Sequence, residues 1–290
     1  MKKRVRVVVL LMLGFWVFVA VGVAASLPVL VSNSVAVDGL LAPTSPSATA
    51  TPDASAQKAR ALLDKMIAAL GGEAFLNYAT RTEQGRAYGF YQGRPNGAGV
   101  EFRYFWQYPD KDRAEVGKKR NVVQIHSGDQ GYEITYKGTA ALGEKEMQDY
   151  LRRRDRSMNT VLRQWLKDPN TLLLYAGPGI ADNRMTEQIT VVNAKDESVT
   201  IAVDPTSYLP VQKSFTYRDP VDNLKSEETE TYGNYRLEQG IMTAHSIVRG
   251  KNGDMVSQRF LTRVEYNPQL KTSLFDATVT YDPAARKRKR

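Results

Sequence analysis

The last third of the chain is a regular succession of strand-like runs separated by turn residues. Five runs between Ser198 and Phe275 are rich in β-branched and aromatic residues: Val199–Val203, Leu209–Tyr217, Glu227–Leu237, Ile241–Val248 and Met255–Tyr266. The connections include Asp204-Pro205, Gln239-Gly240 and Asn252-Gly253, and Asn-Gly between two such runs is a strong hairpin signal. Hairpin connections join antiparallel strands. This region therefore predicts one long antiparallel meander. Such a sheet forms a wall of the fold, and no part of it has the pattern of a catalytic loop.

A second, shorter meander precedes it. The expected strands are Thr80–Tyr91, Val100–Tyr108, Asp112–Val116, Asn121–His126 and Tyr132–Lys137. In the run from Val100, five residues share one face and alternate with polar ones, with Phe105 as the exception: Val100, Phe102, Tyr104, Trp106 and Tyr108. An alternation of period two indicates one wet face and one face that meets apolar material.

Helices are expected before and between the meanders. Apolar residues at helical spacing predict a helix from Ser55 to Leu70, which Gly71-Gly72 ends. A longer helical pattern spans Glu144–Leu166 and carries the cluster Arg152-Arg153-Arg154 partly opposite its apolar side. Asp168-Pro169 then predicts the start of a short helix through Leu172–Tyr175 that stops at Gly177.

The element order is helix, strands, helices, strands, which predicts an α+β fold. About ten twisted antiparallel strands tend to curl, and the central helices can cover the concave face of such a strongly curved sheet. The expected domain spans residues 55–277, a length that suits one core.

The two ends differ from this body. Residues 1–36 begin with four basic residues and continue with an apolar run from Val7 to Val31, which predicts a signal peptide or a retained N-terminal membrane anchor. Either one places the body on the exported side of the membrane. Residues 37–54 are rich in Ala, Pro, Ser and Thr and predict a flexible linker. Residues 278–290 form a basic tail, predicted to be disordered, in which Arg286–Arg290 offers a contact for an anionic membrane surface.

The formal net charge of +9 resides in these ends. Nine of the 40 basic residues lie in residues 1–36 and 286–290, and the rest balance the 31 acidic residues. A neutral, exported body argues against a nucleic-acid partner. The chain has no cysteine, which excludes disulfides and thiolate chemistry.

The sequence contains few residues in patterns typical of catalytic or metal-binding sites. The two histidines, His126 and His245, lie on separate expected strands, so neither a metal site nor a cofactor is predicted. Ser127 and Asp129 near His126 are explained as turn residues, and a hydrolase that depends on His126 stays a minor alternative. The acidic run Glu227, Glu228 and Glu230 is interpreted as a solvated strand face rather than as paired catalytic carboxylates. We therefore expect a protein that is not an enzyme.

Several local patterns carry a family resemblance. In Val199–Lys213 a strand ends at Asp204, and a short turn leads through Leu209-Pro210 into the next strand. Tyr232-Gly233-Asn234-Tyr235 leads to Gly240-Ile241, Val264–Asn267 leads to Leu274-Phe275, and Leu70-Gly71-Gly72 ends the first helix. With these features the chain resembles the outer-membrane lipoprotein-sorting, LolA/LolB-like, superfamily of periplasmic proteins.

The resemblance implies an incomplete antiparallel barrel whose open side is closed by a helical lid, here Glu144–Tyr175. In the family the enclosed cavity takes acyl chains, and a strand arginine latches the lid; Arg86 and Arg103 are the candidates here. The implied partner is a lipid or an acylated, lipoprotein-like protein in the periplasm. The expected cavity lining is Val100, Phe102, Tyr104, Trp106, Ile134, Tyr136, Leu162 and Trp165. From pattern alone the aromatic face of the run from Val100 favours ordinary core, and only the resemblance makes a cavity lining equally compatible with it. An envelope sensor or scaffold with a packed interior is therefore the alternative function.

Overall fold

A computed structural model describes residues 52–283. The expected signal peptide or anchor, most of the linker and the Arg286–Arg290 cluster lie outside the described residues. Within them, no helix is long and apolar enough to cross a membrane.

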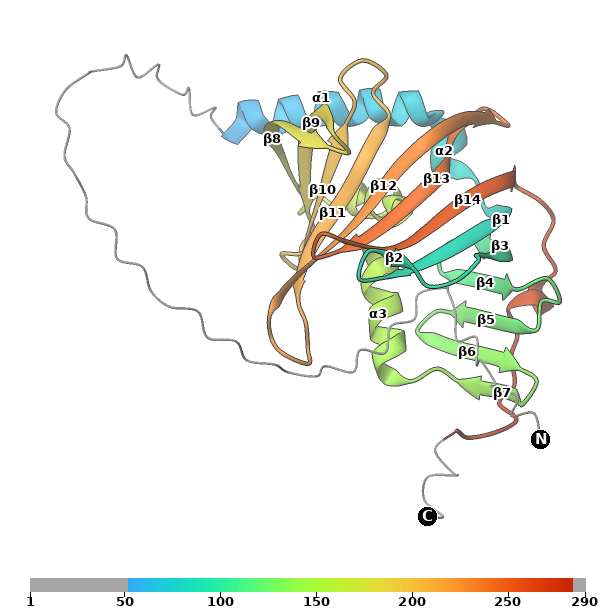
Figure 1. Ribbon diagram of the computed structural model, residues 1–290. Coiled ribbons are helices and arrows are strands. Elements are labelled where there is room, and N and C mark those ends of the chain that lie inside the picture. The colour runs from blue at the N-terminus through green and yellow to red at the C-terminus, as the bar shows by residue number, and fades with distance from the viewer. Residues whose placement is uncertain (1–51, 284–290) are drawn as a thin grey trace, which may run out of the picture.

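Fourteen antiparallel strands form a single sheet with two wings (Figure 1). The N-terminal wing contains β1 (Thr80–Tyr91), β3 (Val100–Gln107), β4 (Lys111–Val116), β5 (Val122–Ser127), β6 (Gln130–Thr135) and β7 (Gly138–Ala141), while β2 (Arg94–Pro95) pairs only with β1. The C-terminal wing contains β8 (Leu172–Ala181), β9 (Arg184–Val192), β10 (Ser198–Val203), β11 (Pro210–Arg218), β12 (Lys225–Glu238), β13 (Ile241–Lys251) and β14 (Asp254–Tyr266). Pairing of β1 with β14 joins the wings, and β7 and β8 remain as edges. The predicted α+β fold with an open, strongly curved antiparallel sheet is confirmed.

Helix α1 (Pro52–Leu70) fills the concave side of the C-terminal wing. Ala59, Leu63 and Met66 are fully buried in one cluster with Ile189 and Ile201 of the sheet. Gly71 and Gly72 have positive φ values, and the Gly72 amide donates to the carbonyl of Ile67 at 2.8 Å, as in the expected glycine C-cap. The helix begins at Pro52, so three residues of the expected linker belong to it. The short helix α2 (Glu73–Asn77) follows.

The expected long helix after the first meander is divided into α3 (Glu144–Asp155), α4 (Met158–Arg163) and the 3₁₀ turn η1 (Trp165–Lys167). Ser157 causes the break, because its hydroxyl accepts a hydrogen bond from the Thr160 amide at 3.2 Å and caps α4. In Figure 1, α1 runs across the ends of strands β8 to β13, whereas α3 lies apart from it, beside β4 to β7. The two helices thus cover different parts of the concave face.

The expected short helix at Leu172–Tyr175 is wrong, because these residues begin β8. Leu172 and Leu174 are exposed, whereas Leu173 and Tyr175 pack against the core, which is the alternation of a strand. Asp168 makes an Asx-type turn onto the Asn170 amide (2.9 Å) instead of capping a helix. Pro178, which follows the Gly177 expected to end the segment, is accommodated because β8 is an edge strand.

The C-terminal segment covers the convex face of the N-terminal wing. In the 3₁₀ turn η2 (Thr272–Phe275), Phe275 is buried against Ile125, and both Phe105 and Ile134 pack on this cluster. This contact explains why Phe105 interrupts the polar face of its strand. Thr280, expected in a disordered tail, donates its amide to the carbonyl of Thr139 in β7 at 2.8 Å.

Candidate functional site

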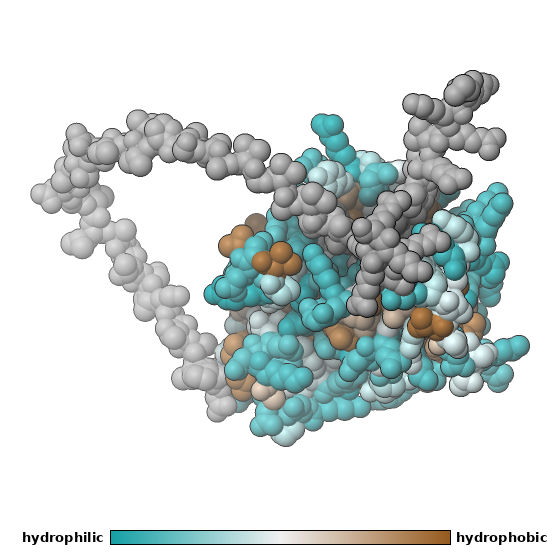
Figure 2. All heavy atoms as spheres, turned by 90° about the horizontal axis from the view of Figure 1, so that it is seen from below, coloured by the Kyte–Doolittle hydropathy of each residue, from teal (hydrophilic) through white to brown (hydrophobic). Residues whose placement is uncertain are grey.

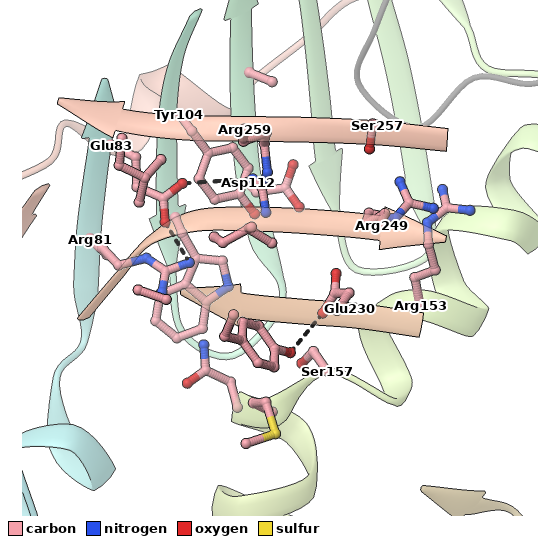
Figure 3. A pocket seen from close by; sticks show the side chains of 18 of the residues that line it. Arg81, Glu83, Tyr104, Asp112, Arg153, Ser157, Glu230, Arg249, Ser257 and Arg259 are labelled. Atoms are coloured by element: carbon pink, nitrogen blue, oxygen red, sulfur yellow. Dashed lines mark hydrogen bonds and ion pairs between the residues drawn. The ribbon is translucent and has the colours of Figure 1, made fainter. Parts of the chain in front are cut away.

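A cavity of about 560 Å³ lies between the concave face of the sheet and the helices (Figure 3). Strands β1, β3, β4, β5 and β12 to β14 form its floor, and residues of α2, α3 and α4 contribute to its wall. This volume is in the range of pockets that hold small organic ligands. The cavity occupies the part of the concave face that α1 leaves uncovered.

Aromatic side chains form one side of the cavity. The ring of Tyr78 packs against those of Trp106 and Tyr266, with centroid separations of 5.3 and 4.8 Å. The hydroxyl of Tyr78 donates to Asn159 in α4 at 2.8 Å, and the guanidinium of Arg163 lies 5.0 Å from the centre of the Tyr78 ring. Edge contacts of this kind fix ring orientations, so this side of the cavity is preorganised.

The eight residues predicted to line the cavity lie in several places. Tyr104 and Trp106 are in the cavity wall. Phe102, Leu162 and Trp165 are buried in the main core, and Val100 packs against that core. Ile134 packs on the convex-face cluster, and Tyr136 is 90 % exposed. Ile134 lies on the face of β6 that meets the C-terminal segment and not the helices, whereas Tyr136 lies in the turn after β6.

A row of charged side chains crosses neighbouring strands in register, and two of its members, Glu230 and Arg249, line the cavity. Lys213, Glu230 and Arg249 are direct neighbours on β11, β12 and β13. Lys213 is only 2 % exposed, and its ammonium lies 2.9 Å from Glu230. Burial alone would raise the pKa of Glu230, but Lys213, Arg249 and Arg259 outweigh burial and hold this pKa well below its ordinary value. Glu230 is therefore a carboxylate at neutral pH.

Two further carboxylates each serve more than one guanidinium. Glu228 lies 3.4 Å from Arg249 and 3.6 Å from Arg152, and Glu83 lies 3.1 Å from Arg81 and 3.7 Å from Arg259. The acidic run in β12 was interpreted as solvated, which is wrong for Glu228, since this residue is buried at 6 % exposure. Its partners come from β13 and α3, which lie far from it in sequence.

His126 belongs to a buried polar group at the edge of the cavity. Its Nδ1 lies 2.8 Å from Asp112, and the other oxygen of Asp112 accepts the hydroxyl of Tyr150 at 2.5 Å. The Tyr150 ring stacks on the imidazole at 3.6 Å. Burial and the neighbouring Asp112 raise the pKa of Tyr150, so its hydroxyl remains a donor. In the described part of the chain no serine hydroxyl bonds to His126, and Asp129 pairs with Arg154 instead.

Helix α3 is attached to the sheet by its own arginines. Arg152 lies over the ring of Tyr217 at 3.7 Å, Arg154 donates to the carbonyl of Gly128 at 2.7 Å, and Arg156 donates to Glu197 at 2.8 Å. The resemblance implied a latch from a strand arginine, but Arg86 is exposed, and Arg103 lies in a small polar surface pocket away from the cavity. In this chain, therefore, the arginines that attach the helix belong to the helical segment, and their partners belong to the strands and turns of the sheet.

The charged floor and the helix attachment were not predicted from sequence. One signal was present: successive strands carry a charged residue at a mid-strand position, namely Lys213, Glu230, Arg249 and Arg259. Only the register shows that the first three meet across neighbouring strands. Among residues 52–283, no group of three or more His, Asp or Glu side chains is arranged to hold a metal ion.

No family model matches the sequence, and no curated protein matches it. Among solved structures, a DUF1329 family protein from Desulfovibrio piger aligns with a TM-score of 0.54 at 10% identity and covers 77% of this chain and 97% of that one. An outer-membrane lipoprotein-sorting protein domain from Vibrio parahaemolyticus aligns at a TM-score of 0.48 and 10% identity, covering 76% and 97%. A LolA superfamily protein from Nitrosomonas europaea aligns at 0.46 and 11%, covering 75% and 97%. At 10% identity, the alignment with the DUF1329 family protein shows a likeness of fold alone.

Proposed function

We propose that this protein is an envelope protein of the periplasm that holds a lipid or an acylated ligand in the cavity between the sheet and helices α3 and α4, without catalysing a reaction. The observation that carries the proposal is the cavity itself, a space of about 560 Å³ in a fold whose other concave half is filled by side chains. Its mixed lining, with aromatic rings on one side and charged groups across the floor, suits a molecule with an apolar chain and a polar end.

The energetics of such binding favour long chains. Each buried methylene contributes roughly 0.8 kcal/mol, so a chain that reaches past Trp106 gains affinity with every carbon that it buries. Tyrosine and tryptophan provide apolar surface with a polar tip, so an apolar chain can lie against the rings of Tyr104 and Trp106 in the cavity wall.

The test is native mass spectrometry of protein purified without detergent, together with uptake of a fluorescent fatty-acid probe. We expect co-purified lipid in the natural protein. The variant Trp106→Glu should lose uptake because it places a charge among the aromatic rings. Tyr136→Glu is the matched control, since this tyrosine is 90 % exposed, and it should behave like the natural protein.

Protein that is consistently empty and takes up no probe would refute the proposal and favour an envelope scaffold or sensor. The face of the molecule in Figure 2 is mostly hydrophilic, with hydrophobic side chains in small, separate groups. It therefore presents no broad apolar surface of the type that supports stable protein association.

A further inference from the structure

A buried glutamine in the cavity wall lacks a hydrogen-bond partner. Gln124 lies on β5, lines the cavity and is only 4 % exposed. Among the described residues, no group donates a hydrogen bond to its side-chain oxygen, Oε1. Buried polar groups in proteins are nearly always hydrogen bonded. The unpaired amide of Gln124 therefore points to a partner that enters the cavity from outside the chain.

Of the described residues in the cavity wall, two others have a buried polar atom without a hydrogen bond, but both are held in ion pairs. The guanidinium of Arg81 lies 3.1 Å from Glu83, and Glu83 also lies 3.7 Å from Arg259. The attraction between opposite charges compensates for the burial of these groups. The amide of Gln124 is uncharged and has no such compensation, so hydrogen bonding is the interaction open to it.

The neighbours of Gln124 in the sheet do not supply the missing hydrogen bond. It faces Ala114 on β4, whose side chain is apolar, and Glu133 on β6, whose carboxylate accepts hydrogen bonds but donates none. Two positions further along β5, His126 is engaged by Asp112 at 2.8 Å. Because Ala114 is small and also lines the cavity, the amide of Gln124 borders the open space.

Tyr104 lies close to this position in the cavity wall. It is the direct neighbour of Ala114 on β3, so Tyr104 and Gln124 flank the alanine in one row across three strands. Burial, reinforced by Asp112, raises the pKa of Tyr104 well above its ordinary value, so its phenol keeps its proton at neutral pH. The row therefore combines two uncharged hydrogen-bonding groups with a small residue between them.

The chemistry of these two side chains selects the kind of group that they can bind. A primary amide has an acceptor oxygen and a donor nitrogen, and a phenol has both functions on one oxygen. A hydroxyl group also donates and accepts, so it can satisfy either end of the amide. A carboxylate only accepts and would leave Oε1 of Gln124 unpaired, which weakens binding.

We infer that Gln124 binds a hydroxyl group at the polar end of the ligand, which is an uncharged, hydroxylated lipid, and that the apolar chain extends past Tyr104 and Trp106. This inference rests on the proposed function, since it defines the polar end of the same ligand. Beyond Trp106, the rings of Tyr78 and Phe75 continue the aromatic side of the cavity, with centroid separations of 5.3 Å from Trp106 to Tyr78 and 6.2 Å from Tyr78 to Phe75. The chain therefore has an apolar path away from Gln124.

The experiment compares three ligands with the same acyl chain: monolauroylglycerol, methyl laurate and laurate. Affinities for the delipidated protein are measured by displacement of a fluorescent fatty-acid probe. In the natural protein we expect monolauroylglycerol to bind about tenfold more tightly than methyl laurate, because its hydroxyls form hydrogen bonds in a buried site that the methyl ester leaves unpaired. Laurate should bind no more tightly than monolauroylglycerol, since its carboxylate cannot donate to Oε1 of Gln124.

The variant Gln124→Met replaces the amide with an apolar side chain of similar shape. Monolauroylglycerol should lose its advantage in this variant, while continued binding of methyl laurate shows that the cavity is intact. The unliganded variant should melt at a higher temperature than the natural protein, because a buried unpaired amide is removed. Gln107→Met is the matched control, since strand alternation places Gln107 on the face of β3 opposite Tyr104, and it should change neither quantity.

Equal binding of monolauroylglycerol and methyl laurate, tighter binding of laurate, or an advantage of monolauroylglycerol that survives in Gln124→Met would overturn the inference and leave the proposed function standing. A lower melting temperature of the unliganded variant would do the same, because it would mean that the amide is already hydrogen bonded inside the folded protein. Failure of all three ligands to bind would overturn the proposed function and the inference with it.

Discussion

The concave face of the sheet has two regions, which the helices cover in different ways. Under α1, strands β8 to β11 carry Ile189, Val199 and Ile201, which are completely buried against Leu63 and Met66. Under α3 and α4, the strands carry aromatic and charged residues around a cavity. The difference lies in the side chains of the covering helices: those of α1 are aliphatic and fill the groove, whereas α3 has no buried residue and reaches the sheet through long polar side chains. A helix held in this way covers a space without filling it.

The largest effect is expected at Lys213, on the border of the two regions. Lys213→Ala leaves Glu230 without its nearest cation, which is itself buried, and breaking a buried ion pair costs about 3 to 5 kcal/mol. Chemical denaturation at neutral pH measures the change. Lys195→Ala, in the turn between β9 and β10, is the control and should change the free energy of unfolding by less than about 0.5 kcal/mol.

The same pair predicts the pH dependence of stability. The pKa of Glu230 in the folded protein lies below its ordinary value of 4.5, so its contribution is fully present above about pH 4.5 and is lost as the pH falls further. Denaturation between pH 3 and 6 should therefore show an acid-side loss of stability that is smaller in Lys213→Ala. An unchanged acid-side slope in the variant would mean that Lys213 does not control this titration.

The next effect concerns the attachment of α3. Tyr150→Phe removes the hydroxyl that donates to the buried Asp112 at 2.5 Å, and a hydrogen bond to a charged group contributes about 1.5 to 3 kcal/mol. We expect faster amide hydrogen exchange in α3 with little change in α1, because the two helices cover separate regions. Tyr132→Phe is the control, since its hydroxyl bonds to Gln130 on the surface. Equal acceleration in both helices would show that the concave face opens as one unit.

Replacing a buried alanine with leucine in each region tests whether the region under α1 is fully packed and the region under α3 and α4 contains a cavity. Ala59→Leu adds volume to the completely buried face of α1 and should cost about 1 to 3 kcal/mol through overpacking. Ala114→Leu adds the same volume to a buried residue of the cavity wall, between Tyr104 and Gln124, where space is available. We expect it to be nearly neutral in denaturation and to weaken ligand uptake. Equal costs at the two positions would contradict the distinction.

Local patterns were sufficient for the packed region and insufficient for the cavity. The stripe from Leu62 to Leu70 predicts α1, and the turns at Asn252-Gly253 and Gln239-Gly240 predict the hairpins, because these signals involve residues close in sequence. The partners of Glu228 and the stacking of Tyr150 on His126 join segments separated by 20 residues or more. An acidic residue in a strand is compatible with water or with a buried guanidinium, and only the register across the sheet decides between them.

The smallest effect is expected at the edge strand, where a run of leucines was mistaken for a helix. Leu172 is 60 % exposed and Leu173 packs against the core under α1, although the two are adjacent. In a strand, Leu172→Thr should change the free energy of unfolding by less than about 0.5 kcal/mol, since threonine suits strands and no buried contact is lost. Leu173→Thr should cost at least 1 kcal/mol more, because it removes buried apolar surface and inserts a hydroxyl. Similar costs at both positions would contradict the strand alternation of Leu172 and Leu173. They would also contradict the packing of β8 against α1.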